Sequence, residues 1–560
     1  MAHEYEWLGD LDEAAAYPDD ASAQGEIRRV DTHISHVFLT GARAYKLRRP
    51  VSLAFLDFTS AAERLADCLR EVALNRRLAP DVYLGVAPVL AAGKSVCIGP
   101  IGENPSADPD ALEHCVVMRR LKAGRDLLSM LERDAVTPLQ IDRIAVRLAL
   151  FHAGHSLGQP APWSAEDWLA CTTAPARANF DALAGAPPQL APPAQVERAR
   201  QLACAFAEAR RDDFEARRAA GRIVDGHGDL HCEHVWFEHD EDEPLMVDCL
   251  EFREDFRRID AASDAAFLAM DLAYRERPDL AARFLRRYAQ ASGDYHLFSV
   301  IDYFLSYRAL VRAKVASLRA TDASMSEEER GAAAVSVRRH LDLGLDFLDT
   351  PGRGCVMITC GSIGTGKSTV AEALADANGG VVISSDRLRR DSGDTAREPA
   401  GYGQDRYSDA ARAAVYEQLL EQAGYVVDSG RVAILDATFS RRAWRDAAAR
   451  WAQQRGCEAS LVEVVAPRDA VLARLAAREE AAASRQPDER RQTPGSGDAS
   501  EAGPGLYDAM RAEFEDPVEW PAARLVRIDT SRPDWREQAA AAARRLAPGR
   551  APFPFQRIPR

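Results

Sequence analysis

The sequence predicts two domains: an α+β domain over residues 31–349 and an α/β domain with a parallel sheet over residues 355–560. First, a chain of 560 residues is too long for a single hydrophobic core. Second, a mostly β stretch precedes a long helical stretch in the first part, whereas apolar runs alternate with helical patterns in the second. Residues 350–354, Thr-Pro-Gly-Arg-Gly, have the composition of a linker. For residues 1–30 we expect an irregular, acidic N-terminal segment.

Composition limits the classes of partner. The chain carries 71 Lys and Arg against 86 Asp and Glu, a formal charge of −15. This charge argues against a general binder of nucleic acid or of anionic membranes, because phosphate groups require a basic face. The ten cysteines form no C-x-x-C pair, and no apolar run approaches 18 residues. We therefore expect a cytoplasmic protein with reduced thiols, no signal peptide and no membrane partner.

The elements of the first domain follow from residue periodicity. Alternating patterns predict a hairpin and further strands, and 3.6-residue patterns predict helices. The predicted strands are 34–39, 44–47, 82–89, 96–98 and 115–118, and the predicted helices include 61–78, 139–155 and a long helix over 194–220.

The strongest motif lies at the start of the second domain. Residues 361–368 spell G-x-x-x-x-G-K-S between an apolar run and a helical pattern, which is the arrangement of a phosphate-binding P-loop. Its glycines let backbone N–H groups surround an anion, its lysine reaches the outer phosphates and its serine can hold Mg²⁺. It predicts binding of ATP or GTP through Gly361, Gly364, Gly366, Lys367, Ser368 and Thr369.

Polar residues follow the next two predicted strands of this domain. Strand 381–384 leads to Asp386, a candidate base for an attacking hydroxyl, and strand 432–435 leads to Asp436, a candidate Mg²⁺ ligand. A further strand covers 460–465 and a polar lid covers 479–505. The candidate lid and substrate arginines are Arg387, Arg390 and Arg478.

The first domain has its own pair of carboxylates, Asp229 and Asp248, each in a loop beside an apolar strand. In phosphoryl transfer one carboxylate accepts the hydroxyl proton and another holds Mg²⁺. Lys46, on a predicted strand, could reach nucleotide phosphates, and Glu71, on the following helix, could pair with it.

These motifs resemble known families. His227-Gly-Asp229-Leu-His231 followed by Val247-Asp248 resembles the aminoglycoside phosphotransferase and choline kinase family, which has a protein-kinase-like fold. The resemblance implies that Asp229 is the catalytic base and Asp248 the principal metal ligand. The second half resembles the kinase domain of polynucleotide kinase and the gluconate, shikimate and zeta-toxin kinases. The whole chain resembles bacterial fusions of an aminoglycoside phosphotransferase-like domain with an ATP-binding P-loop domain.

One position departs from the first family, which has Asn five residues after the base where this chain has His234. Three interpretations stay open. His234 could serve as a metal ligand through water or with another metal; the domain could be a pseudokinase; or Asp248 could suffice alone.

The sequence thus predicts an ATP- and Mg²⁺-dependent phosphotransferase with two nucleotide sites that acts on hydroxyl groups of small molecules. The alternatives are a pseudokinase domain that regulates an active P-loop kinase, a nucleic-acid end kinase, and an aminoglycoside-modifying kinase. The acidic balance argues against the nucleic-acid alternative.

Overall fold

The computed structural model describes residues 5–53, 56–102, 110–349, 352–391, 409–484 and 507–547. The chain forms two compact units, each assembled from separate segments. Unit 1 consists of Met1–Arg143, Gly154–Leu157 and Ile223–Asp264. Unit 2 consists of Ile144–Ala153, Gly158–Arg222 and Ala265–Arg560. The helices that precede residue 350 are therefore largely grouped with the C-terminal part.

A six-stranded antiparallel sheet organises unit 1, in the order β1-β2-β3-β8-β6-β7. The predicted hairpin is present, because β2 and β3 are paired neighbours in this sheet. The strands are β1 (Arg28–Asp31), β2 (Ser35–Leu39), β3 (Arg43–Arg48), β6 (Tyr83–Ala92), β7 (Ser95–Ile98) and β8 (Ala111–Arg119).

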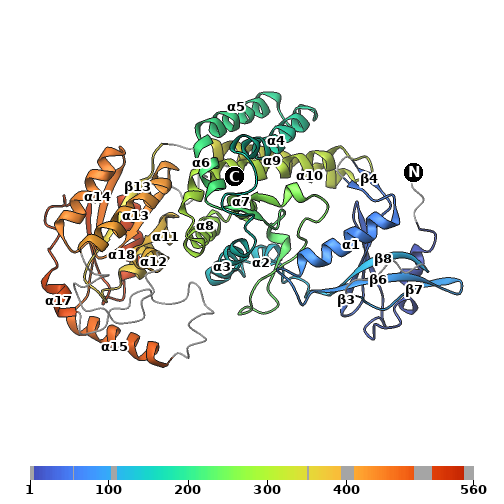
Figure 1. The fold of residues 1–560 in the computed structure, drawn as a ribbon, viewed down its shortest axis with the longest axis horizontal. Coiled ribbons are helices and arrows are strands. Elements are labelled where there is room, and N and C mark those ends of the chain that lie inside the picture. Colours follow the sequence, from blue (N-terminus) through green and yellow to red (C-terminus); the bar gives the residue numbers. More distant parts are fainter. Residues whose placement is uncertain are drawn as a thin grey trace. The chain divides into compact units, whose positions relative to one another are not determined.

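Helix α1 (Ala61–Asn75) lies along this sheet (Figure 1). Its first turn is capped by Ser60, whose hydroxyl accepts the backbone N–H of Glu63. Cys68 and Val72 pack in one buried cluster with residues of β6 and β8. Burial of such apolar side chains contributes roughly 1.5–3 kcal/mol each, so α1 presents its polar residues to β3 from a fixed position.

The N-terminal segment has more structure than the sequence predicts. It contains η1 (Leu8–Asp12) and η2 (Ala14–Ala16), two short 3₁₀ helices. Leu11 and Tyr17 are buried in the same cluster as Phe38 of β2. An irregular lead-in was expected because single apolar residues on short turns give no periodic pattern.

Short elements carry the candidate loops of unit 1. β9 pairs with β12, and β10 pairs with β11, both antiparallel. The loop with Asp229 lies between β9 and η3, and Asp248 follows β11. The remaining elements of this unit are β4 (Ser52–Leu53), β5 (Leu56–Asp57), α2 (Leu127–Glu132), β9 (Ile223–Asp225), η3 (Cys232–His234), β10 (Val235–Trp236), β11 (Leu245–Met246), η4 (Glu254–Phe256) and β12 (Arg258–Asp260).

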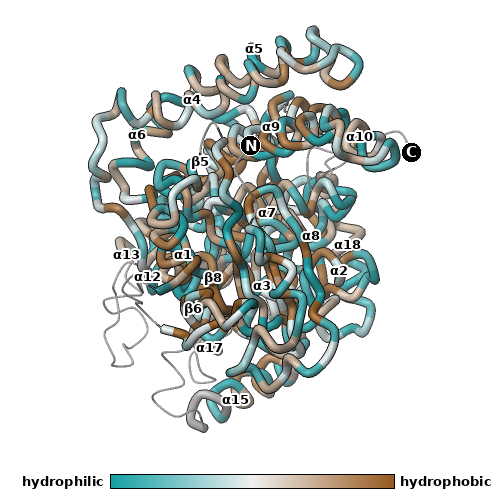
Figure 2. Tube along the Cα trace, turned by 90° about the vertical axis from the view of Figure 1, so that its right-hand side faces the viewer, coloured by the Kyte–Doolittle hydropathy of each residue, from teal (hydrophilic) through white to brown (hydrophobic). Residues whose placement is uncertain are grey.

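Helices make up the first part of unit 2, and Figure 2 shows hydrophilic and hydrophobic residues mixed along α5, whose buried face repeats every three to four residues. The prediction of one helix over 194–220 was wrong, because the chain leaves helical geometry at Arg210. Asp212 and Asp213 then stabilise the start of α6. The helices, of which α3 and α7 begin in unit 1, are α3 (Pro138–Gly154), α4 (Ala165–Ala184), α5 (Pro193–Ala209), α6 (Arg211–Ala219), α7 (Ala261–Tyr274), α8 (Pro278–Ser292), η5 (Tyr295–Ser299), α9 (Ile301–Thr321) and α10 (Glu327–Leu348).

The predicted parallel sheet is confirmed in unit 2. Five parallel strands have the order β14-β15-β13-β16-β17, with helices packed around them (Figure 1). β17 and α18 extend the predicted alternation. The strands are β13 (Cys355–Cys360), β14 (Val381–Ser384), β15 (Val432–Asp436), β16 (Glu458–Val465) and β17 (Leu525–Asp529). The helices are α11 (Lys367–Asn378), α12 (Ser385–Asp391), α13 (Asp409–Asp428), α14 (Arg442–Gln454), α15 (Arg468–Ser484), α17 (Tyr507–Ala512) and α18 (Trp535–Leu546).

The helical part of unit 2 contacts the parallel sheet at its edge strand β14. The hydroxyl of Tyr295 donates to the carbonyl of Val382 at 3.2 Å. Arg286 of α8 pairs with Glu372 at 3.3 Å and also with Asp376, both on α11. These bonds join η5 to β14 and α8 to α11, the helix that follows the P-loop.

Two sequence features fall partly outside the described residues. The predicted lid over 479–505 begins within α15, and its remainder from residue 485 lies outside them, as does the start of the predicted linker at 350–351.

Within the described ranges, no helix is both long and apolar enough to cross a bilayer.

Candidate functional sites

In unit 1 the structure brings Lys46 of β3 beside two carboxylates. Lys46 Nζ lies 2.8 Å from Glu71 Oε1 of α1 and 3.1 Å from Asp248 Oδ1. Burial alone would lower the pKa of Lys46, but the charges of Asp248 and Glu71 raise it well above its usual value. Lys46 in turn holds the pKa of Asp248 well below its usual range. Both groups are therefore charged at neutral pH.

A second buried cation, Arg48, was missed by sequence analysis. Its side chain is fully buried and contacts three carboxylates: Asp67 at 2.7 Å, Glu71 at 2.6 Å and Glu251 at 2.5 Å. Residues two apart on a strand share a face, so position 48 faces the same side as Lys46. That spacing was the available signal. Arg48 thus connects α1 to the loop after Asp248.

This cluster has more carboxylates than cations. Two cations, Lys46 and Arg48, face four acids. Burial raises the pKa of Glu251 to about 8, against the opposing charge of Arg48. A carboxyl with this pKa is largely protonated at neutral pH, so Glu251 adds little negative charge to the cluster.

The loop that carries Asp229 is fixed by its own backbone. The Asp264 carboxylate accepts the N–H groups of His227 at 2.7 Å and Gly228 at 2.9 Å. His227 Nε2 donates to the carbonyl of Val247 at 2.9 Å, and its Nδ1 accepts the N–H of Asp229 at 3.3 Å. Burial lowers the pKa of His227 to about 4. His227 is thus a neutral structural residue that positions the loop.

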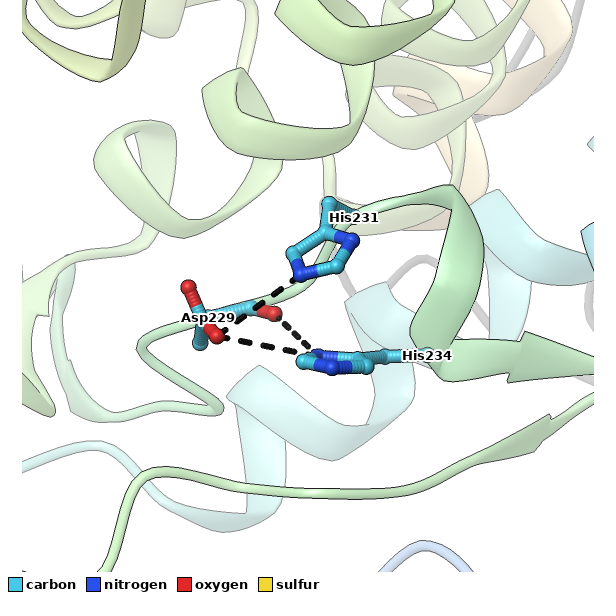
Figure 3. A group of neighbouring side chains, drawn as sticks. All are labelled: Asp229, His231 and His234. Carbon is cyan, nitrogen blue, oxygen red and sulfur yellow. Dashed lines mark hydrogen bonds and ion pairs between the residues drawn. The ribbon is translucent and has the colours of Figure 1, made fainter. Parts of the chain in front are cut away.

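His231 and His234 lie next to Asp229, as Figure 3 shows, with ring centroids 3.9 Å apart. His231 Nε2 and His234 Nδ1 each lie 3.8 Å from Asp229 Oδ2. His234 Nδ1 is also 2.8 Å from the backbone carbonyl of Asp229. On its other side, His234 Nε2 lies 3.5 Å from Asp248 Oδ2. Side-chain donors of Asp229, His231 and His234 fall within 4.8 Å of one another.

The donor set of unit 1 suits a metal ion, although not only Mg²⁺. Asp229 and Asp248 offer the oxygen ligands that Mg²⁺ prefers, whereas His231 and His234 offer nitrogen. Asp248 has a φ of +62°, a left-handed conformation that is costly for a residue with a Cβ atom. The fold therefore maintains a strained backbone at the carboxylate predicted to bind metal.

In unit 2 the P-loop joins β13 to α11. Gly361 has a φ of +155°, and a Cβ atom there would clash with the carbonyl of Val464. Gly366 has a φ of +92° directly before α11. Gly364 also has positive φ, while Ser368 and Thr369 are exposed on the first turn of α11. The strand–loop–helix arrangement leaves the N–H groups of this turn available to an anion.

The predicted polar residues of unit 2 follow neighbouring strands and therefore lie at the carboxyl ends of the parallel sheet. Burial lowers the pKa of Lys367, against the nearby charges of Asp436 and Asp386. Burial raises the pKa of Asp436 to about 6, while a hydrogen bond from Ser368 and the charge of Lys367 oppose the rise. Lys367 Nζ donates to the carbonyl of Ser362 at 2.8 Å. The Ser368 hydroxyl and the Asp436 carboxylate are oxygen donors and fit Mg²⁺.

The candidate arginines have different surroundings. Arg387 donates to the carbonyl of Gln290 at 3.4 Å, and Arg390 is exposed. The charge of Arg478 contributes to lowering the pKa of Lys367, so Arg478 lies near the P-loop. Arg389, which was not predicted, pairs with Asp386 at 2.7 Å.

Arg474 and Thr530 support the P-loop and were not predicted as a pair. Arg474 donates to Thr530 Oγ1 at 2.8 Å and to the Thr530 carbonyl at 2.9 Å. Thr530 Oγ1 donates to the carbonyl of Thr365 at 2.7 Å. Because Thr530 follows β17, which the sequence pattern did not indicate, no local signal could have found this contact.

Residues 356–517 match the family described as AAA domain. The chain is 34% identical over 427 residues to the Mycobacterium tuberculosis protein Rv2004c, covering 75% of this chain and 80% of the relative. This chain belongs to the Rv2004c family. The Mycobacterium bovis member Mb2027c aligns with the same identity and coverage.

Two solved structures are similar to this Rv2004c-family chain over different fractions of its length. A choline/ethanolamine kinase family protein from Mesorhizobium loti has 14% identity and a TM-score of 0.35, covering 60% of this chain and 98% of that protein. A gluconokinase from Sinorhizobium meliloti has 20% identity and a TM-score of 0.24, covering 35% of this chain and 95% of that protein.

Proposed function

We propose that the chain is an ATP-dependent phosphotransferase with two nucleotide sites, one in each unit, that phosphorylates hydroxyl groups of small molecules. The proposal rests chiefly on the parallel sheet, in which the P-loop follows β13, Asp436 ends the neighbouring strand β15 and Asp386 follows β14, the strand after that. A P-loop alone accounts for nucleotide binding. Asp386, beside the P-loop, supplies a base that can accept the proton of an acceptor hydroxyl.

In unit 2 each residue has a separate role. The N–H groups of the P-loop after Gly361 and the Lys367 ammonium bind the phosphates, and Asp386 accepts the proton of the acceptor hydroxyl. The acceptor oxygen then bonds to the γ-phosphorus while the bond to the β–γ bridging oxygen breaks, which releases ADP. Mg²⁺, held by Ser368 and Asp436, would neutralise phosphate charge.

In unit 1 the proposed roles parallel these. Lys46, kept in place by Glu71, binds phosphate oxygens, and Asp248 binds the cation. Asp229, presented by the loop that Asp264 and His227 order, accepts the acceptor proton. The proposal is supported by the distances of 2.8 and 3.1 Å from Lys46 to its two carboxylate partners.

The test is ADP formation by the full chain with a panel of hydroxylated metabolites. We expect Asp386→Asn to lower turnover at the unit 2 site by roughly 10²–10⁴-fold, the range for loss of a positioned acid–base group. Lys367→Ala should lower it as well, because the site loses the charge that binds the phosphates. Asp229→Asn should lower turnover at the unit 1 site similarly. Asp508→Asn, which alters an exposed carboxylate paired with Arg468, is the matched control. Turnover that equals wild type in all three site variants would refute the proposal.

A second candidate function concerns unit 1 alone. The histidine at position 234 favours a nucleotide-sensing pseudokinase that regulates unit 2. The distinguishing experiment uses His234→Asn in a Lys367→Ala background, so that only unit 1 can turn over. A large gain in phosphotransfer favours a decayed catalyst, whereas a loss favours a working site.

A further inference from the structure

The geometry around His234 points to a cation site in unit 1 for a divalent transition ion, bound by His234 Nε2 and Asp248 Oδ2. We propose that this ion, and not Mg²⁺, is the preferred metal of unit 1. The role of the ion in phosphate binding rests on the proposed function, but the site itself follows from the contacts of two side chains.

The first step is to decide which of the two ring nitrogens of His234 carries the hydrogen. His234 Nδ1 lies 2.8 Å from the carbonyl oxygen of Asp229, which can only accept a hydrogen bond. Nδ1 therefore carries the hydrogen, and in a neutral imidazole the lone pair is on Nε2. A ring that donates one N–H to a carbonyl while the other nitrogen faces a ligand position is the usual arrangement of metal-binding histidines.

The second step is the partner of Nε2. Asp248 Oδ2 lies 3.5 Å from it, too far for a hydrogen bond. Both facing atoms are acceptors, so a positive charge between them would satisfy both. Two ligands each about 2.1 Å from one ion at a near-tetrahedral angle are separated by about 3.4 Å, which agrees with the observed distance.

The third step is to decide whether the ion binds at Nδ1 or at Nε2 of His234. His234 Nδ1, which is 3.8 Å from Asp229 Oδ2, is already used as a donor to the backbone. An ion bound through Nδ1 would have to displace that bond. An ion at Nε2 leaves the bond intact and leaves the Asp229 carboxylate available as a base. The two nitrogens of His234 thus separate the cation position from the proposed base.

The chemistry of the pair selects the class of ion. One imidazole and one carboxylate suit transition ions, whereas Mg²⁺ prefers oxygen and binds nitrogen poorly. Nitrogen ligands also strengthen binding from Mn²⁺ towards Zn²⁺. We therefore expect the full chain to bind Mn²⁺ and Zn²⁺ in preference to Mg²⁺ at this position without any nucleotide.

Pulsed electron paramagnetic resonance of Mn²⁺ bound to the full chain tests the site directly, because a coordinated imidazole gives a ¹⁴N coupling. We expect this coupling in the wild type and in His231→Asn, and its loss in His234→Asn. His239→Asn, in an exposed turn, is the matched control and should retain it. Calorimetric titration should show the preference for Mn²⁺ over Mg²⁺ falling on the order of tenfold in His234→Asn.

The contrary results are equally specific. No ¹⁴N coupling in the wild type would overturn the inference and indicate an ion pair between a protonated His234 and Asp248. Loss of the coupling in His231→Asn but not in His234→Asn would overturn it in favour of the Asp229 side. Coupling that behaves as expected, together with unchanged turnover in Asp229→Asn, would support the metal site and refute phosphotransfer in unit 1. Circular dichroism of each variant checks folding.

Discussion

Arg48 Nη2 lies 2.6 Å from Glu71 Oε2, while Lys46 Nζ lies 2.8 Å from the other oxygen, Oε1, of the same carboxylate. Glu71 is thus bound by two cations of one strand. A glutamate held on both oxygens has little rotational freedom, so Lys46 is held towards Asp248.

Removal of Arg48 should therefore destabilise unit 1. Arg48→Met leaves buried carboxylates without their partner, and we expect the free energy of unfolding to fall by about 3–5 kcal/mol. Urea denaturation measures the loss. Arg70→Met is the control, because Arg70 pairs with Asp67 at 3.4 Å from a half-exposed position and should cost less than about 1 kcal/mol. Equal losses in both variants would contradict a central role for Arg48.

The loop before Asp229 should tolerate no side chain at Gly228. This residue has a φ of +83°, and a Cβ atom would lie 2.9 Å from the carbonyl oxygen of Phe256. Gly228→Ala should cost roughly 1–3 kcal/mol and displace Asp229, which lowers turnover in unit 1. In Gly331→Ala, within α10, the new Cβ atom meets nothing within 4 Å, so this control should gain roughly 0.5–1 kcal/mol. Wild-type stability and turnover in Gly228→Ala would refute the expectation.

Unit 2 should lose stability in acid through Asp294. This buried carboxylate pairs with Arg217 at 2.8 Å. Burial alone would raise the pKa of Asp294, but Arg217 lowers it to about 2. Because the folded pKa lies below the unfolded value of about 3.9, the stabilisation is complete above that value and is lost as the pH falls from about 4 to 2.

The Asp294→Asn variant tests this dependence. It should lower the free energy of unfolding at pH 7 by about 3–5 kcal/mol, since Arg217 loses its buried partner. It should also flatten the decline of stability between pH 4 and 2. Asp349→Asn, which alters an exposed pair with Arg198, should leave both unchanged. An unaltered acid decline in Asp294→Asn would assign that decline to other carboxylates.

The contact between α8 and the P-loop helix should couple the two parts of unit 2. Arg286, 1% exposed, pairs with Glu372 and Asp376 of α11. Arg286→Met should raise hydrogen exchange in α11 and the P-loop, because it leaves these acids without a buried cation. Arg283→Met removes only the more exposed partner of Asp376 and should have a smaller effect. Unchanged exchange in both variants would mean that the contact carries no coupling.

Local patterns were sufficient for much of the second half. The P-loop, its flanking strand and helix, and the Asp436 that ends β15 could be predicted because periodicity and glycine chemistry are properties of adjacent residues. The same holds for the hairpin that carries Lys46 and for the helix that carries Glu71. The helix break at Arg210 and strand β17 were not predicted, because the local patterns that mark them are short.

The sequence by itself thus determined which residues could bind phosphate and which carboxylates were available as bases or metal ligands. Only the tertiary structure decided their partners. Arg48 meets Glu251 across 203 residues of sequence, and the hydrogen-bond acceptor of His234 Nδ1 depends on the path of the Asp229 backbone. Such contacts arise from packing, which no local period records. The position of the hydrogen on the His234 ring, on which the proposed metal preference rests, depends on that packing.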